Sequence, residues 1–139
     1  MKLLTKIRRW TWELPQTLVG ACLLPFYKKS TLKVMEFGDT KAYFSSKFPG
    51  GISLGYYVFI GWKGKTKLTN PSMQDTIGHE CFGHGTQSKW LGPLYLPVIG
   101  LQSITWAALY GTLVKPTKNG YYKFWTEKWA DKIAGIVRK

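Results

Sequence analysis

The sequence is poor in acidic residues and in the side chains that most often bind metals. It has seven Asp and Glu against 20 Lys and Arg, a formal net charge of +13, with only two His and two Cys. Two cysteines can form at most one disulfide, which excludes a disulfide framework and indicates free thiols in a reducing compartment. With 139 residues, 45% of them hydrophobic, the chain is expected to fold around a core.

The N-terminal segment also lacks the uninterrupted apolar stretch of a signal peptide, because Glu13 and Pro15 interrupt it. We expect residues 1–28 to form a basic, aromatic helical segment that rests on the core or on a membrane surface. Residues 90–114 carry no charge and are long enough to span a membrane. Their prolines and polar residues favour a buried connecting helix over a span or a re-entrant segment. From these features we expect a cytoplasmic protein, with peripheral association with a membrane left open.

Turn and capping residues divide the rest of the chain. Strands are predicted over 31–37, 41–48 and 52–62, separated by Gly38-Asp39 and Pro49-Gly50-Gly51. Asn70-Pro71 is a strong helix start, so a helix is expected from 71 to about 90, followed by helices over 95–113 and 121–137. The predicted class is α+β in one domain of residues 1–139. It has a three-stranded antiparallel sheet within 31–62 and three helices within 71–137.

Both histidines lie on the helix predicted from residue 71. Zinc binds imidazole nitrogens and carboxylates, and His-Glu-x-x-His places two rings on one helical face. His79 and His84 are one residue further apart, which in a regular α-helix rotates them by about 140°. A single π-bulge would return them to one face. The alternative is a different ligand set, in which Glu80 pairs with His84 or Asp75 with His79. Cys81 is a further alternative ligand, although a buried apolar role fits it better.

Two carboxylates, Glu127 and Asp131, lie four residues apart on the last predicted helix and so share one face. In this arrangement the chain resembles the thermolysin-like zinc metallopeptidases, the gluzincins. That resemblance implies that His79, His84 and Glu127 bind Zn²⁺ and that Glu80 is the catalytic general base. It also implies that Asp131 orients a ligand histidine.

A narrower resemblance, to a family of small bacterial proteins of unassigned function, covers nearly the whole chain. That family carries His-Glu-x-Gly-His followed by Gln-Ser, and here Gly83 precedes His84 while Gln87-Ser88 follows it. Gln87 would orient His84 or line the cleft, or it would form an interhelical hydrogen bond. The shared segments are Trp12-Glu13-Leu14-Pro15-Gln16, Pro49-Gly50-Gly51-Ile52-Ser53-Leu54-Gly55, the stretch 87–96 and Phe124-Trp125-Thr126-Glu127-Lys128-Trp129-Ala130-Asp131.

These patterns lead to two functional hypotheses. The first is a zinc metallopeptidase that hydrolyses a peptide or protein substrate, with a strand in 52–62 as the edge that pairs with it. The second is a non-catalytic basic protein that binds an anionic membrane surface or nucleic acid, attracted by the net charge. Its predicted contacts are Lys63, Lys65, Lys67, Arg8 and Arg9, although no nucleic-acid motif is present.

Overall fold

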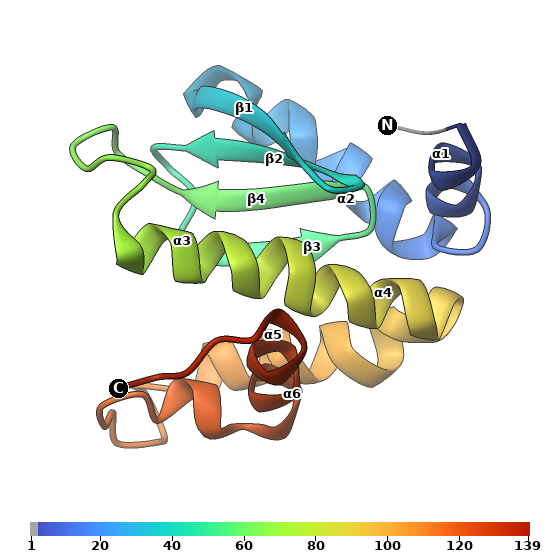
Figure 1. The fold of residues 1–139 in the computed structure, drawn as a ribbon. Coiled ribbons are helices and arrows are strands. Elements are labelled where there is room, and N and C mark those ends of the chain that lie inside the picture. Colours follow the sequence, from blue (N-terminus) through green and yellow to red (C-terminus); the bar gives the residue numbers. More distant parts are fainter. Residues whose placement is uncertain (1–2) are drawn as a thin grey trace.

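The structure is a computed structural model that describes residues 3–139. Figure 1 shows the order of the elements along the chain. The helices are α1 (Leu3–Trp10), α2 (Leu14–Tyr27), α3 (Pro71–Ile77), α4 (Gly85–Leu91), α5 (Leu101–Leu109) and α6 (Trp125–Ala134). The strands are β1 (Thr31–Phe37), β2 (Thr40–Ser45), β3 (Gly51–Leu54) and β4 (Tyr57–Gly61). Short 3-10 turns lie at η1 (Lys28–Ser30), η3 (Gly92–Leu94) and η5 (Tyr121–Lys123). Two π-helical stretches, Gly78–His84 (the π segment) and η4 (Leu96–Gly100), complete the set.

The sheet has four strands in the order β1-β2-β4-β3. β1 and β2 form the antiparallel hairpin expected from the sequence, and β3 pairs antiparallel with β4, but β2 and β4 run parallel. The α+β class is therefore correct, whereas the predicted three-stranded antiparallel sheet is wrong. The single strand predicted over 52–62 is in fact the β3–β4 hairpin, and the strand predicted over 41–48 covers only Thr40–Ser45.

Gly55 is the residue that divides the predicted long strand into two. Its φ is +64°, and a Cβ at this position would lie 2.1 Å from the Thr17 hydroxyl oxygen. Glycine at the first position of a two-residue loop is typical of a type II′ hairpin turn. The chain reverses there, so Leu54 pairs with Tyr57. As a result β4 lies between β2 and β3, and β3 becomes an edge strand.

Each face of the sheet is covered by a different part of the chain. On one face, Ala42, Phe44, Val58 and Ile60 pack with Ile77 and Cys81 of the helix that begins at Pro71. On the other face, Tyr43, Leu54 and Phe59 pack with Leu23, Leu24 and Tyr27 of α2 and with Leu96 of η4. Figure 1 shows α3 in front of the sheet and α2 behind it. Burial on both faces explains why β4 is apolar from Tyr57 to Ile60 and why the middle of β2 is apolar from Ala42 to Phe44.

The helix predicted from residue 71 to about 90 is confirmed as α3, the π segment and α4 in continuous succession. The Asn70 side chain accepts a hydrogen bond from the Ser72 backbone at 3.0 Å, which caps the first turn as expected. Gly92, with a φ of +54°, ends the helix. The last predicted helix, 121–137, is shorter than expected, because only Trp125–Ala134 is α-helical.

The uncharged stretch 90–114 differs from the prediction of a buried connecting helix. It contains η3, η4 and α5, and α5 has no buried residue. Leu101 is 64% exposed and Ile104 52%. Within residues 3–139, no helix is both long and apolar enough to cross a membrane.

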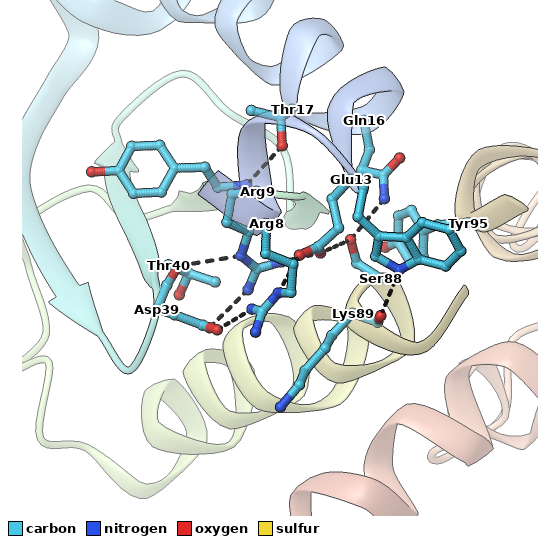
Figure 2. Close-up of polar contacts among 12 residues, drawn as sticks. Arg8, Arg9, Glu13, Gln16, Thr17, Asp39, Thr40, Ser88, Lys89 and Tyr95 are labelled. Atoms are coloured by element: carbon cyan, nitrogen blue, oxygen red, sulfur yellow. Dashed lines mark hydrogen bonds and ion pairs between the residues drawn. The ribbon is translucent and has the colours of Figure 1, made fainter. Parts of the chain in front are cut away.

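A buried polar network joins the N-terminal helices to α4 (Figure 2). Arg9 is 1% exposed, and its guanidinium donates hydrogen bonds to Glu13 and, at 2.8 Å, to Asp39. Ser88 of α4 donates to the same Glu13 carboxylate and accepts a hydrogen bond from Gln16 at 2.9 Å. The network fixes α1 and α2 against the end of the helix that carries both histidines.

Candidate metal centre

The π segment brings the two histidines onto one face of their helix. A π-helical turn takes up an additional residue compared with an α-helical turn, so the five-residue spacing no longer separates the rings. The ring centroids of His79 and His84 lie 4.7 Å apart with the planes nearly perpendicular. Of the two alternatives left open by the sequence, the structure therefore has the π-helical distortion.

Glu127 of α6 completes a three-residue cluster with these histidines. Its Oε2 lies 2.7 Å from His79 Nε2 and 2.9 Å from His84 Nε2. One candidate ligand atom from each residue lies within 4.8 Å of the others, and all three residues are buried. The group could therefore hold a metal ion.

Close packing of α6 on the π segment places Glu127 there. A Cβ on Gly83 would lie 2.5 Å from the backbone oxygen of Ala130, a distance that no side chain tolerates. Only glycine permits this approach of the two helices. The same contact carries Asp131, one turn after Glu127, to the far side of His79.

Each histidine is held through its second ring nitrogen. His79 Nδ1 lies 2.7 Å from Asp131 Oδ1, and His84 Nδ1 lies 2.6 Å from Gln87 Oε1. The Gln87 amide donates to the Thr126 backbone oxygen at 3.1 Å, which fixes its own oxygen toward His84. Both rings therefore donate from Nδ1 and turn Nε2 toward Glu127. This arrangement is typical of metal-binding histidines, whose outer hydrogen bonds set the tautomer and the ring orientation.

The charges of this cluster favour a cation at its centre. With Nδ1 protonated, a neutral ring directs its Nε2 lone pair at the Glu127 oxygen, and the two repel unless a proton or a metal lies between them. Burial opposes a charged imidazole, yet hydrogen bonds to Asp131 and Glu127 outweigh it and raise the pKa of His79 to about 10. Burial likewise opposes a charged Glu127, but the two histidines hold the pKa of that carboxyl well below its usual range.

Glu80 faces the same region from the π segment. It is 7% exposed, and its Oε2 is a buried atom without a hydrogen-bond partner among the described residues. Burial raises the pKa of Glu80, an effect that the nearby His84 and His79 oppose. A buried carboxylate oxygen without a hydrogen-bond partner costs free energy, and proteins keep such groups mainly where they serve a function. Glu80 is therefore suited to accept a proton from a bound molecule.

A cavity of about 190 Å³ lies beside the cluster. Glu80, His84 and Glu127 contribute to one part of its wall. The edge strand β3 forms a second wall, with Ser53 held by a 2.9 Å hydrogen bond from the Tyr95 hydroxyl to its backbone oxygen. Residues of η4 and α5, among them Ile104, form the third wall.

The other residues that the sequence singled out lie elsewhere. Within residues 3–139, neither Asp75 nor Cys81 belongs to the group that could hold a metal ion. Cys81 packs in the core, and burial raises its pKa to about 12, so as a thiol it is a poor ligand. Lys63, Lys65 and Lys67 are exposed in the loop after β4.

Arg8 and Arg9 were expected to contact an anionic partner, and the structure corrects this. Arg9 is buried, and both side chains pair with Glu13 and Asp39. Their charge is used inside the protein, which leaves little for a ligand at this point. The sequence placed them in a basic helical segment that rests on the core or on a membrane surface, and nothing local indicates that Asp39 folds back onto them.

Sequence reasoning missed Arg138. Its guanidinium donates two 2.8 Å hydrogen bonds to Asp131 and lies 3.6 Å from the Tyr122 ring centroid. Burial raises the pKa of Asp131, but the hydrogen bonds from His79 and Arg138 outweigh it and lower that pKa. The only local signal is the spacing of seven residues, two helical turns, and the chain leaves α6 before Arg138 is reached.

No protein-family model matches the sequence, and no curated protein or solved structure is significantly similar to the chain. The comparisons therefore add no relative from which a ligand or a reaction could be transferred.

Proposed function

We propose that the protein is a zinc-dependent peptidase. The observation that carries the proposal is the convergence of His79 Nε2, His84 Nε2 and one Glu127 oxygen, with both Nδ1 atoms held by fixed acceptors. Two imidazoles and one carboxylate are the protein ligands of a known class of catalytic zinc site that keeps one position open. The resemblance to the gluzincins in the His-Glu helix and in Glu127 with Asp131 supports the same assignment.

The donor set favours zinc over other divalent ions. Calcium and magnesium prefer six or more oxygen ligands, and this cluster offers two nitrogens and one carboxylate. The three residues are also buried, which suits a tetrahedral site with few waters.

The chemistry then follows from the residues around the cavity. Zinc bound here would supply Lewis acidity and lower the pKa of a water beside it. Glu80 accepts a proton from the attacking water and delivers it to the amine that leaves when the peptide C–N bond breaks. Tyr121 also lines the cavity, and burial raises its pKa, so its protonated hydroxyl can donate to the oxyanion.

The edge strand β3 suits an extended peptide. An edge strand presents unpaired backbone groups to which a substrate can add as another strand. The backbone groups of Ile52 point to Phe59 of β4, so Gly51 and Ser53 are the residues that face the free edge. The Tyr95 hydroxyl already occupies the Ser53 carbonyl, which leaves Gly51 as the main point of pairing. Gly51 lines the cavity that contains Glu80.

Metal analysis tests the first step of the proposal. Purified protein should contain about one equivalent of zinc, and the Glu127→Ala variant should retain far less, because it loses one of three protein ligands. Elemental analysis after gentle purification without chelators measures both. Less than a tenth of an equivalent in the wild-type protein, with none regained on dialysis against zinc, would refute the zinc site.

The Asp131→Asn variant should bind zinc about 10- to 100-fold more weakly than the wild type. Asparagine accepts a weaker hydrogen bond from His79 Nδ1 than a carboxylate does, and it leaves the Arg138 charge unpaired. Competition with a chromophoric chelator measures the affinity. Asp75→Asn, on the same helix but outside the cluster, is the matched control and should bind zinc as the wild type does.

A further inference from the structure

We propose that the apolar surface formed by α2 and by the segment from η3 to α5 docks onto an anionic lipid bilayer. The proposal concerns a partner and stands on observations separate from the metal centre. The α2–α5 surface is defined by exposed apolar side chains of the two segments: Leu14, Leu18, Val19, Phe26, Leu94, Leu101 and Ile104.

The exposed residues of α2 form one stripe. Leu14, Leu18 and Cys22 follow at intervals of four, with Val19 and Phe26 beside them, and all are exposed. The opposite side of α2 packs against the sheet through Leu23, Leu24 and Tyr27. This helix therefore presents apolar side chains both to the core and to the outside. A helix of a water-exposed surface would carry polar residues on its outer side.

The two segments contribute to the same side of the molecule. Both cover the sheet face that carries Tyr43, Leu54 and Phe59, α2 directly and η4 through Leu96. They also touch each other, because Gln16 of α2 donates to the Gly92 backbone oxygen at 2.9 Å. This contact brings the start of α2 and η3 next to each other, and in Figure 1 α2 lies behind the sheet while the chain leads on from η3 to α5 below it.

Charge distribution selects the partner. Neither 14–27 nor 90–114 contains a charged residue, yet exposed lysines border them at Lys28, Lys29, Lys89 and Lys115. A second copy of the chain would bring a net charge of +13 against +13 across this surface. Nucleic acid would need the lysines on the surface rather than around it. An anionic bilayer suits both the apolar side chains and the bordering lysines. The apolar side chains would enter the lipid, and the lysines around them, the lysine rim, would contact the anionic headgroups.

Two exposed tryptophans support the same orientation. Trp12 is 49% exposed and Trp90 57%; Trp90 follows Lys89 directly, and Trp12 lies two residues before the uncharged segment 14–27. The Trp12 indole donates a hydrogen bond to the Lys89 backbone oxygen at 3.0 Å, so Trp12 lies beside Lys89 at the edge of the surface. Tryptophan is enriched at the level of lipid headgroups, where one part of the ring is apolar and the N–H is polar.

Docking would place the cavity of the metal centre close to the bilayer. Ile104 belongs both to the cavity wall and to the α2–α5 surface. If the proposed peptidase function holds, substrates would be taken from protein segments at the membrane surface. Vesicle binding needs neither zinc nor hydrolysis, so the docking proposal can be refuted without refuting the peptidase function, and the reverse also holds.

The exposed Cys22 offers a direct test, because Cys81 is buried and would escape labelling. An environment-sensitive fluorophore attached to Cys22 should shift its emission to shorter wavelength with vesicles containing about a third phosphatidylglycerol. Spin-labelled lipid should then quench it. With phosphatidylcholine vesicles alone the affinity should be at least tenfold lower, because the lysine rim loses its partner. A fluorophore that stays in water on saturating anionic vesicles would overturn the proposal.

Variants inside and outside the α2–α5 surface provide the second test. The Leu18→Asp/Leu101→Asp protein should partition into anionic vesicles at least tenfold less than the wild type, because two apolar contacts are lost. Val137→Asp, also exposed but outside the surface, should change partitioning less than twofold. Equal partitioning of all three proteins would refute the proposal. So would a stable wild-type dimer in sedimentation that Leu18→Asp/Leu101→Asp dissociates, since a second copy would then occupy the surface.

Discussion

The Glu80→Gln variant should lose at least a hundredfold in peptide hydrolysis while keeping its zinc. Glutamine has nearly the same shape as glutamate but cannot accept a proton, and proton transfer by a positioned side chain contributes about 10²- to 10⁴-fold. Glu80 is not one of the three residues that could hold the metal, so its replacement should leave the ligand set intact. Its buried Oε2 has no hydrogen-bond partner among the described residues, so the fold should not depend on it.

The measurement is hydrolysis of fluorophore-labelled casein by zinc-loaded protein, with zinc content determined on the same samples. Glu36→Gln, an exposed acid on β1, is the matched control and should hydrolyse casein as fast as the wild type. If Glu80→Gln retained the wild-type rate, Glu80 would not be the general base. If it lost its zinc, its role would be in metal binding instead.

The residues of the site could be predicted from the sequence because scarce residue types cluster there. Both histidines stood out by their rarity and spacing, the Glu127–Asp131 pair was singled out by its spacing together with the resemblance to the gluzincins, and the structure brings all four together. The geometry of the His helix was beyond the sequence, because a five-residue spacing fits either a π-helical distortion or a different ligand set. The structure has the distortion where α6 packs on Gly83, a contact between residues far apart in the chain.

The errors in the fold have a similar cause. Strand propensity alone made 52–62 a single strand, and the turn at Gly55 depends on close contact with Thr17 of α2. Parallel pairing of β2 with β4 joins strands that are not consecutive, which local patterns do not reveal. For α5 the apolar composition predicted burial, whereas the helix has no buried residue in the structure.

Replacing Glu13 with Gln should destabilise the protein by about 1.5–3 kcal/mol, the usual contribution of a hydrogen bond to a charged group, because Arg9 keeps Asp39 as a partner. Arg9 and Glu13 are 1% and 0% exposed, so neither charge can turn to water instead. Glu13 also accepts hydrogen bonds from Arg8 and from Ser88, and both would lose a charged acceptor. Urea unfolding followed by tryptophan fluorescence measures the change, and Glu36→Gln should shift it by less than about 0.5 kcal/mol.

The double variant Arg9→Met/Glu13→Leu separates the charge from the packing. Replacing a buried ion pair by apolar residues of similar volume is often neutral or stabilising, because the cost of desolvating both charges disappears. The double variant should therefore be more stable than Glu13→Gln, even though Asp39 loses one of its two arginines. If it were as unstable as Glu13→Gln, the hydrogen bonds of Glu13 with Ser88 and Arg8, rather than its pairing with Arg9, would dominate. The network would then act mainly by fixing α4, and with it the helix that carries His84, against the N-terminal helices.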